Sequence, residues 1–188
     1  MPEQLTDPIA QFPAATVACF DPTAGELPRR KLDREQTIRF LERLTAGGAR
    51  SLLIGASTGQ GHLRTPEELE QWFAVAAEAR VGDAWRMALL RPEDGLDTNR
   101  HLLEGLKRAG YQCVFFRPGN NLPADASDEQ IAANIQPLVA LAAAMELPVG
   151  VYSIPDVSGV RLTAAAAAQL VAAPGSAEYL SLALTLAF

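Results

Sequence analysis

The chain has 188 residues, with 22 acidic and 16 basic side chains and a net charge of -6. This length suits one ordinary domain with its own core. The acidic excess disfavours a phosphate backbone as ligand, so we expect no nucleic-acid partner. The opening segment MPEQLTDPIAQ has no basic and no apolar region, so we expect no signal peptide. No apolar stretch is long enough for a bilayer, and the sequence predicts a cytoplasmic protein without a membrane contact.

Apolar runs typical of strands alternate with helical runs along the chain. The expected strands cover residues 14–20, 51–56, 86–91, 113–118, 148–155 and 179–186. The expected helices lie between them, at residues 33–48, 65–80, 97–110, 127–145 and 163–173. Asp33 and Thr65 stand at N-cap positions, and Glu68 completes a capping box with Thr65. The alternation predicts six consecutive strand-and-helix units.

Such regular alternation predicts a parallel sheet with crossover helices, because parallel strands need long connections. An open doubly wound sheet and a closed eightfold barrel both satisfy this pattern. Strand 148–155 alternates, with Val149 and Val151 expected to face outward and Gly150 and Tyr152 inward, which favours a barrel. A full barrel typically needs about 250 residues. We therefore predict an α/β fold, an incomplete TIM (β/α)8 barrel of about six units, as a single domain over residues 1–188.

The two cysteines, Cys19 and Cys113, both lie in apolar runs that read as strands. No CxxC motif and no Cys/His pair accompanies them, so we expect buried free thiols. We accordingly predict no metal site and no cofactor.

The loop GASTGQGHLRT follows the second expected strand, at the end of the strand where barrels keep their sites. Ser57, Thr58 and backbone N–H groups between Gly55, Gly59 and Gly61 could hold a carboxylate or a phosphate. A simple strand-to-helix turn is the alternative, and the loop alone does not decide between them.

The letters GASTG also fit the G-x-S-x-G nucleophile elbow of serine hydrolases, with Ser57 as the nucleophile. That elbow needs a helix directly after the serine, whereas the capped helix begins near Thr65. The chain has two histidines for a triad, His62 in the same loop and His101 within an expected helix. The hydrolase remains an alternative function.

A second candidate site is YSIPDVSG, residues 152–159, at the end of the fifth expected strand. With Gly150, Tyr152 would face inward and offer a phenolic proton to the barrel mouth. A buried structural tyrosine is the competing interpretation.

Several segments, in this order and spacing, resemble the dihydrodipicolinate synthase and N-acetylneuraminate lyase family. They are FDPTAGELPRRKLD, GASTGQG followed by TPEEL, LPVGVYSIPDVSGVRLT and LSLALT. YSIP is similar to the family's Tyr-Asn-x-Pro, and ASTGQ to its Gly-Ser/Thr-Thr-Gly-Glu. The resemblance covers the first six of the family's eight barrel units, so we expect a chain truncated after the sixth strand.

The resemblance implies class I aldolase or lyase chemistry, in which a lysine forms a Schiff base with pyruvate or a related 2-oxo acid. By position, Thr58 and Gly59 would bind the substrate carboxylate and Ser57 would act in the proton relay. Tyr152 would be the general acid and base. These residue types suit the chemistry, because a carboxylate needs short donors and carbon–carbon chemistry needs a positioned proton carrier.

The sequence departs from the family pattern at the covalent step. Ala183 stands where the family carries its Schiff-base lysine, and the only lysines, Lys31 and Lys107, lie elsewhere. Val157 replaces a substrate-binding arginine, Gln60 replaces a glutamate, and GNN replaces a Tyr-Tyr pair. We therefore predict an inactive family member. A non-catalytic module that binds a 2-oxo acid or docks another subunit is the second hypothesis, and open sheet edges lead us to expect a homo-oligomer.

Overall fold

The computed structural model describes residues 14–20, 31–172 and 180–185 of the chain, the last range by its backbone. The chain divides into two compact units, which are described separately. The first unit holds residues 1–88 and 108–111, and the second holds residues 89–107 and 112–188. The single domain expected from the sequence stays a prediction.

The described residues form six strands whose order in the sheet follows their order in the chain. The strands are β1 (Ala14–Ala15), β2 (Ser51–Ile54), β3 (Trp85–Leu90), β4 (Cys113–Phe116), β5 (Val149–Ser153) and β6 (Leu180–Thr185). The pairs β1–β2, β2–β3, β4–β5 and β5–β6 are all parallel. The predicted parallel α/β architecture is confirmed. The first strand is shorter than expected, and Phe20 instead forms an isolated antiparallel bridge with Leu32.

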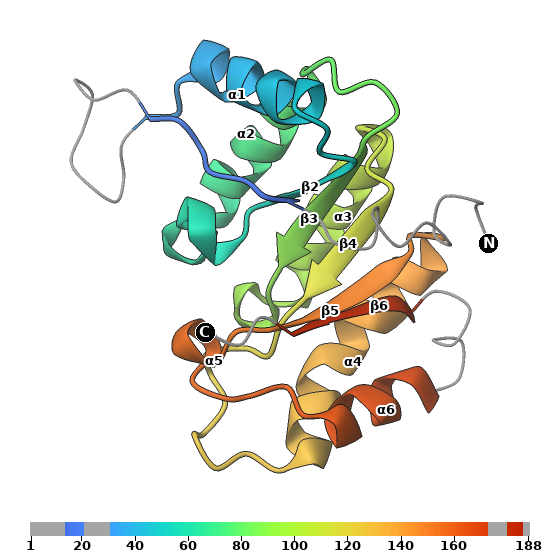
Figure 1. The fold of residues 1–188 in the computed structure, drawn as a ribbon. Helices are drawn as coiled ribbons and strands as arrows, with labels where there is room; N and C mark the ends of the chain where they lie inside the picture. Colours follow the sequence, from blue (N-terminus) through green and yellow to red (C-terminus); the bar gives the residue numbers. More distant parts are fainter. Residues whose placement is uncertain (1–13, 21–30, 173–179, 186–188) are drawn as a thin grey trace. The chain divides into compact units, whose positions relative to one another are not determined.

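Helices α1 (Arg34–Ala46) and α2 (Pro66–Ala77) belong to the first unit (Figure 1). The Asp33 side chain caps α1 by accepting a hydrogen bond from a backbone N–H three residues on. At α2, Thr65 accepts from the backbone N–H of Glu68, and Glu68 accepts in return from that of Thr65. The capping box predicted from the sequence is confirmed, and it fixes where the loop after β2 ends.

The core of the first unit lies between its helices and strands. Leu52, Ile54, Leu69 and Trp72 are at most 1% exposed. Phe73 packs edge-on against the ring of Tyr111, with ring centroids 6.0 Å apart. The Tyr111 hydroxyl donates to the Phe73 carbonyl over 2.9 Å, which satisfies the buried phenol.

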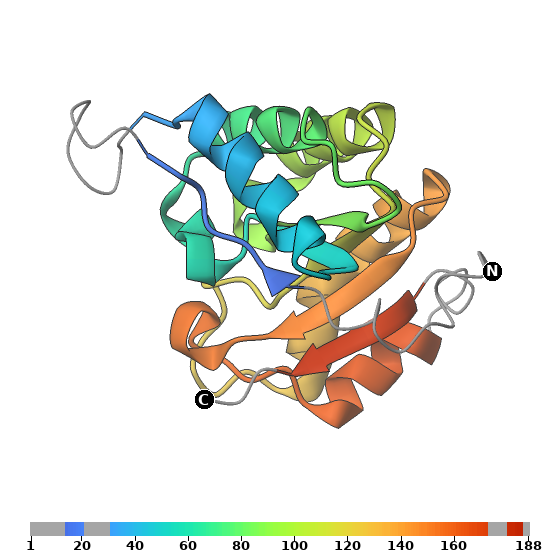
Figure 2. The ribbon, with the colours of Figure 1, turned by 45° about the horizontal axis from the view of Figure 1, so that its top comes forward.

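The second unit contains helices α3 (Leu96–Arg108), α4 (Asp128–Ala144), α5 (Pro155–Ser158) and α6 (Ala164–Ala172). Helices α4 and α6 lie side by side, on the same side of β5 and β6 (Figures 1 and 2). Ser127 begins α4 with a capping box that it shares with Gln130. The short helix α5 was not predicted, because it occupies the loop after β5, where proline at its first position starts a single turn.

The strands β4 and β5 are buried on both faces, as expected for parallel strands covered by helices. Their register pairs Phe115 with Gly150 and Phe116 with Val151. A Cβ on Gly150 would lie 2.3 Å from the Phe115 ring, so the aromatic ring fills the space beside the glycine. Phe115 and Gly150 therefore share one face of the sheet.

Candidate functional site

The loop after β2 consists of two short 3-10 turns, η2 (Ser57–Gly59) and η3 (Gly61–Leu63). Gln60 joins them in the left-handed region, at φ 60°, which is unusual for a residue with a side chain. The sequence places glycines on both sides of it. The loop is therefore a defined turn and not a plain connection to α2.

Backbone hydrogen bonds hold this loop together. The N–H groups of Gly59 and Gly61 both donate to the Ala56 carbonyl, over 3.1 and 3.0 Å. The N–H of Gln60 donates to the Ser57 carbonyl over 2.8 Å. These three N–H groups are engaged inside the loop and are therefore not available to an anion.

Two glycines in the loop are required by close contacts. A Cβ on Gly59 would lie 2.4 Å from the Trp72 ring and 2.6 Å from the Thr16 carbonyl oxygen. A Cβ on Gly61 would lie 1.8 Å from the carbonyl oxygen of Gly55. Real Cβ atoms do not approach so closely, and residues from β1's extension and α2 thus shape the turn.

The side chains of Ser57 and Thr58 lie at the surface end of this turn. Ser57 is half-buried and Thr58 is exposed. Within the described residues, neither hydroxyl takes part in a hydrogen bond to another residue. Both hydroxyls can therefore donate to a ligand. The carboxylate or phosphate site expected at this loop stays a prediction.

The serine hydrolase alternative lacks its expected structural setting. Two 3-10 turns separate Ser57 from α2, whereas a nucleophile elbow enters its helix directly. Among the described residues, no hydrogen bond joins Ser57 to His62. His101 is exposed on α3, which belongs to the second unit.

Arg64, at the end of the same loop, was not singled out from the sequence. It is 4% exposed, and its guanidinium carbon lies 4.0 Å from the centre of the Phe20 ring. Its Nη2 donates to the Gln60 side-chain oxygen over 3.4 Å. Burial lowers the pKa of Arg64, and the nearby Glu68 carboxylate opposes that shift. The signal available in the sequence was a cation in a glycine-rich loop.

Tyr152 lies in the second unit, at the carboxyl end of β5, and is 1% exposed. The loop that follows is fixed by two serines. Ser153 accepts a hydrogen bond from the Leu162 N–H over 3.2 Å, and the Ser158 hydroxyl donates to the Ile154 carbonyl oxygen over 3.0 Å. The structure thus gives Tyr152 a fixed backbone setting, while its role in proton transfer stays a prediction.

Ala183 lies on β6, the neighbour of β5 in the second unit. The register pairs Ala183 with Val151 and Leu184 with Tyr152, after an irregularity between Val149 and Gly150. The backbone register therefore does not align Ala183 with Tyr152. The side chains of β6 lie outside the described part of the structure, and so does residue 179, so the assignment of Ala183 to the family's lysine position stays a prediction.

Two buried ion pairs in the second unit were also missed from the sequence. Arg117, directly after β4, binds Glu93 through both terminal nitrogens and is 2% exposed. Arg91, directly after β3, binds Asp94 with 2.7 Å between Nε and Oδ2. Arg91 and Asp94 are only three residues apart and meet within one turn, whereas Arg117 and Glu93 are 24 residues apart and are brought together by the fold.

The segment that replaces the family's Tyr-Tyr pair is tied to α4. The Gly119 N–H donates to the Asn134 side-chain oxygen over 2.8 Å. Asn134 donates in turn to the side chain of Asn121 over 3.4 Å. These side chains therefore stabilise the loop after β4. Val157, in the place of the family's arginine, is half-buried within α5.

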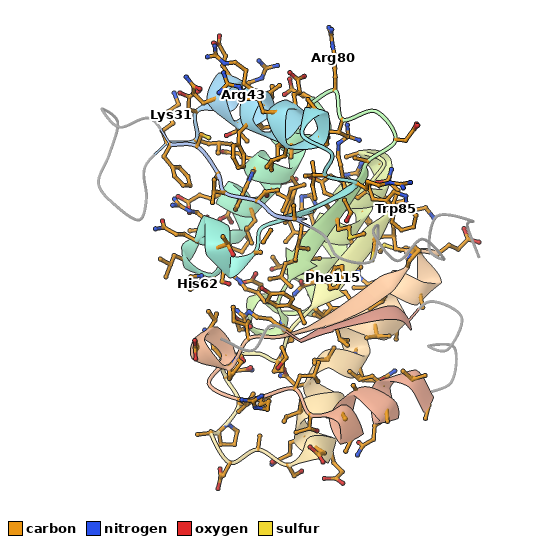
Figure 3. The ribbon with its side chains drawn as sticks, viewed as in Figure 1. Lys31, Arg43, His62, Arg80, Trp85 and Phe115 are labelled. Atoms are coloured by element: carbon orange, nitrogen blue, oxygen red, sulfur yellow. The ribbon has the colours of Figure 1, made fainter. Side chains whose placement is uncertain are left out.

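Neither lysine lies on a strand. Lys31 is exposed on the segment leading into α1, where Figure 3 labels it. Lys107 lies on α3, and its Nζ is 2.6 Å from the Met145 carbonyl oxygen and 3.6 Å from the Glu146 carboxylate. The expectation that neither lysine lines the barrel stays a prediction.

The cysteine prediction is confirmed for one residue and only partly for the other. Cys113 is fully buried in β4, whereas Cys19 is half-buried. Both are free thiols. The strand expected at 14–20 ends at Ala15, which leaves Cys19 outside the sheet.

Within residues 14–20, 31–172 and 180–185, no group of three or more His, Cys, Asp or Glu side chains is arranged to hold a metal ion. The same residues include no helix with the length and apolarity needed to cross a bilayer.

Comparison with known proteins finds similar proteins that are named N-acetylneuraminate lyase. No family model matches the chain. N-acetylneuraminate lyase of Salmonella paratyphi B is 30% identical over 155 residues, which cover 78% of this chain and 48% of the relative. The corresponding enzyme of Citrobacter koseri is 28% identical over 152 residues. The chain spans about half the length of the curated relatives it matches.

Solved structures agree on the fold. Ruminococcus gnavus sialic acid aldolase superposes with a TM-score of 0.73 at 15% identity, covering 93% of this chain and 53% of that one. Acinetobacter baumannii dihydrodipicolinate synthase, solved with pyruvate, gives 0.72 at 18% identity, covering 94% and 55%. The chain thus has the fold of an incomplete TIM barrel, as predicted. It belongs to the dihydrodipicolinate synthase and N-acetylneuraminate lyase family.

Proposed function

We propose that this chain binds a small 2-oxo acid such as pyruvate without forming a Schiff base. The observation that carries the proposal is the built turn Ser57–Gly59. Its backbone is fixed by three internal hydrogen bonds and by the Trp72 ring, while the two hydroxyls remain available within the described residues. Such a preorganised pair of donors suits a carboxylate, because little entropy is lost when the ligand binds.

The binding role rests on Thr58 for the carboxylate, with Ser57 as a second hydroxyl donor. The Gly59 N–H, which the resemblance also assigned to the carboxylate, instead donates to the Ala56 carbonyl, so we leave Gly59 out of the binding role. The resemblance assigns Tyr152 the role of proton carrier, and the proposal keeps that assignment. No cofactor is required for binding of this kind. Full-length relatives carry out aldol condensation or cleavage. We propose this activity for the present chain only where an amine is supplied.

Absence of a suitable amine is the reason to propose binding without covalent chemistry. A Schiff base needs an unprotonated lysine beside the bound keto group. Lys107, on α3, is instead held near the Glu146 carboxylate, and Lys31 is exposed before α1. Loss of a covalent nucleophile can lower a rate by about 10^6, judging by another enzyme class. We therefore expect turnover to be undetectable.

Calorimetry with pyruvate tests the proposal. Titration of the chain with pyruvate should give a saturable heat signal. The double variant Ser57→Ala, Thr58→Val should lose most of that binding. Thr98→Val is the matched control, since it removes a hydroxyl from the outer helix α3. Equal binding by the double variant and the control would overturn the assignment of the carboxylate to this turn.

Covalent chemistry is tested separately by incubating the chain with pyruvate, reducing with borohydride and weighing the product. We expect an unchanged mass. A stable adduct on Lys31 or Lys107 would contradict the proposal and restore a catalytic function. Self-association and a cytoplasmic location remain part of the proposal, and sedimentation velocity measures the former.

A further inference from the structure

A pocket of about 340 Å³ lies in the first unit, between the two connections that lead from a helix into a strand. One connection joins α1 to β2 and the other joins α2 to β3 (Figure 1). The pocket therefore lies where β2 and β3 begin, at the opposite end of β2 from the turn Ser57–Gly59. Its volume falls within the range of small-ligand sites, about 300–1,000 Å³.

Backbone hydrogen bonds fix the walls of this pocket. The Trp85 N–H donates to the Arg50 carbonyl oxygen over 3.0 Å, which joins the starts of β3 and β2. The N–H of Arg80, a residue labelled in Figure 3, donates to the Glu42 side chain over 3.0 Å and ties the second connection to α1. The pocket is thus formed before a ligand arrives, so a ligand would bind with little ordering of the chain.

The uncharged residues of the lining are small. They are Thr45, Gly48, Ala49, Val81 and Ala84. Val81 is 5% exposed, and both alanines are half-buried. A Cβ on Gly48 would meet no atom within 4 Å, so this glycine leaves the space beside it open. The lining therefore offers room and apolar surface to a short aliphatic group.

The pocket also has one cation and one anion in its lining. Arg50 and Asp83 are both exposed, and they come from the two different connections. Within the part of the chain that the structure describes, no ion pair joins them to each other. A ligand with two negative charges would face the Asp83 carboxylate, and one with two positive charges would face the Arg50 guanidinium. A ligand that carries one charge of each sign suits both residues.

We infer that this pocket binds a small zwitterion, a free α-amino acid with an aliphatic side chain. Arg50 binds its carboxylate and Asp83 binds its ammonium group, while the aliphatic side chain lies against the alanines and Val81. The inference is independent of the proposed function, because it uses no residue of the turn Ser57–Gly59.

The donors and acceptors of the lining match the two ends of such a ligand. A guanidinium has five N–H groups in a fork that fits a carboxylate, so Arg50 can bind the ligand and keep a contact elsewhere. The backbone N–H groups of Gly82 and Asp83 make no hydrogen bond within the described residues, and they can add donors for the carboxylate. The Asp83 carboxylate accepts from an ammonium group, which has three donors.

Three ligands with the same branched chain test the need for both charges by calorimetry. They are L-leucine, 4-methylpentanoate, which lacks the ammonium group, and 3-methylbutylamine, which lacks the carboxylate. We expect leucine to bind about tenfold more tightly than either analogue, the size of one hydrogen bond to a charged group. Inorganic phosphate, the probe for a site that prefers a dianion, should bind more weakly than leucine.

Two variants remove the charges one at a time. Asp83→Asn should weaken leucine about tenfold and leave 4-methylpentanoate unchanged or tighter, so the preference for leucine is lost. Arg50→Gln should weaken leucine and 4-methylpentanoate but not 3-methylbutylamine. A purely structural role of either residue would not change the order of the ligands in this way. Asp97→Asn and Arg100→Gln, at exposed positions of α3, are the matched controls.

The remaining outcomes separate this site from the carboxylate turn. Leucine should bind equally well to the double variant Ser57→Ala, Thr58→Val and in the presence of saturating pyruvate. Competition between leucine and pyruvate would overturn the inference, and so would equal affinity for leucine and 4-methylpentanoate, or no binding of leucine at all. Failure of pyruvate to bind would affect only the proposed function. Circular dichroism checks folding, and if Arg50→Gln is unfolded, the exposed substitution Asp83→Asn still decides the matter.

Discussion

The Trp72 ring lies 2.4 Å from the place that a Cβ on Gly59 would occupy. Trp72 on α2 lies thirteen positions after Gly59 in the chain, and it sets the shape of the turn that Gly59 ends. The contact explains why a glycine stands at residue 59, because any side chain there would displace the indole. The helix after the loop therefore supports the proposed carboxylate-binding turn from behind.

Gly59→Ala should therefore destabilise the first unit and distort the turn. We expect a loss of about 1–3 kcal/mol in the free energy of unfolding, as for other overpacked interiors, and a large loss of pyruvate binding. Urea unfolding and calorimetry measure the two effects. Gly47→Ala is the matched control, since φ is -80° there and the nearest atom to its Cβ is 3.3 Å away. Equal behaviour of both variants would contradict the role of Trp72.

A lysine placed on β6 should restore covalent chemistry, and its position tests two expectations. The family resemblance assigns the reactive amine to residue 183, whereas the backbone register sets residue 184 beside Tyr152. A slip of one residue exchanges the faces of a strand, so only one of these positions can present an amine to the site. We expect Ala183→Lys to give a borohydride-stable adduct with pyruvate.

Leu184→Lys is the matched variant for this comparison, and intact-mass measurement after reduction is the readout. An adduct with Leu184→Lys alone would show that the register, and not the resemblance, identifies the covalent position. Failure of both variants, in protein that is folded and binds pyruvate, would argue that β6 does not border the site.

The two thiols should differ in reactivity. Burial raises the pKa of Cys113 to about 12, so this thiol stays protonated and unreactive at mildly alkaline pH in the folded protein. Burial and the nearby Asp33 also raise the pKa of Cys19, which is only half-buried. A disulfide reagent should modify Cys19 slowly and Cys113 only after unfolding. Rapid modification of both in folded protein would contradict the burial of β4.

The ionisation of Cys113 should lower the free energy of unfolding at alkaline pH. In the unfolded chain Cys113 ionises near its usual value of about 8.5. The pKa of Cys113 is higher in the folded state. Its contribution to the free energy of unfolding is therefore fully present below the pKa of the unfolded chain and is lost as the pH rises toward about 12. Cys113→Ala or Cys113→Val should flatten the fall in midpoint seen in urea unfolding at increasing pH.

The hydrolase alternative predicts that a fluorophosphonate labels Ser57. We expect no labelling, because two 3-10 turns separate Ser57 from α2 and no hydrogen bond to His62 is found among the described residues. Peptide mapping after exposure to the reagent measures the outcome. Labelling that disappears in Ser57→Ala would restore the hydrolase function.

The sequence by itself determined the succession of elements. Period-two and helical patterns identified six strands and their main helices, and local capping signals located the starts of α1 and α2, because caps involve residues only three apart. The patterns failed for elements that consist of a single turn. The short helix α5 and the 3-10 turns after β2 were not predicted, since single turns leave little periodicity.

The sequence also pointed to candidate site residues, through motifs of contiguous letters such as GASTG and YSIP, and these assignments stay predictions. Only the tertiary structure decided which groups are available and which are engaged. The ring of Trp72 against Gly59, the pair Arg117–Glu93 and the register of β6 all join residues distant in the chain. Such contacts arise from strand pairing and packing, so they cannot be predicted from local sequence patterns.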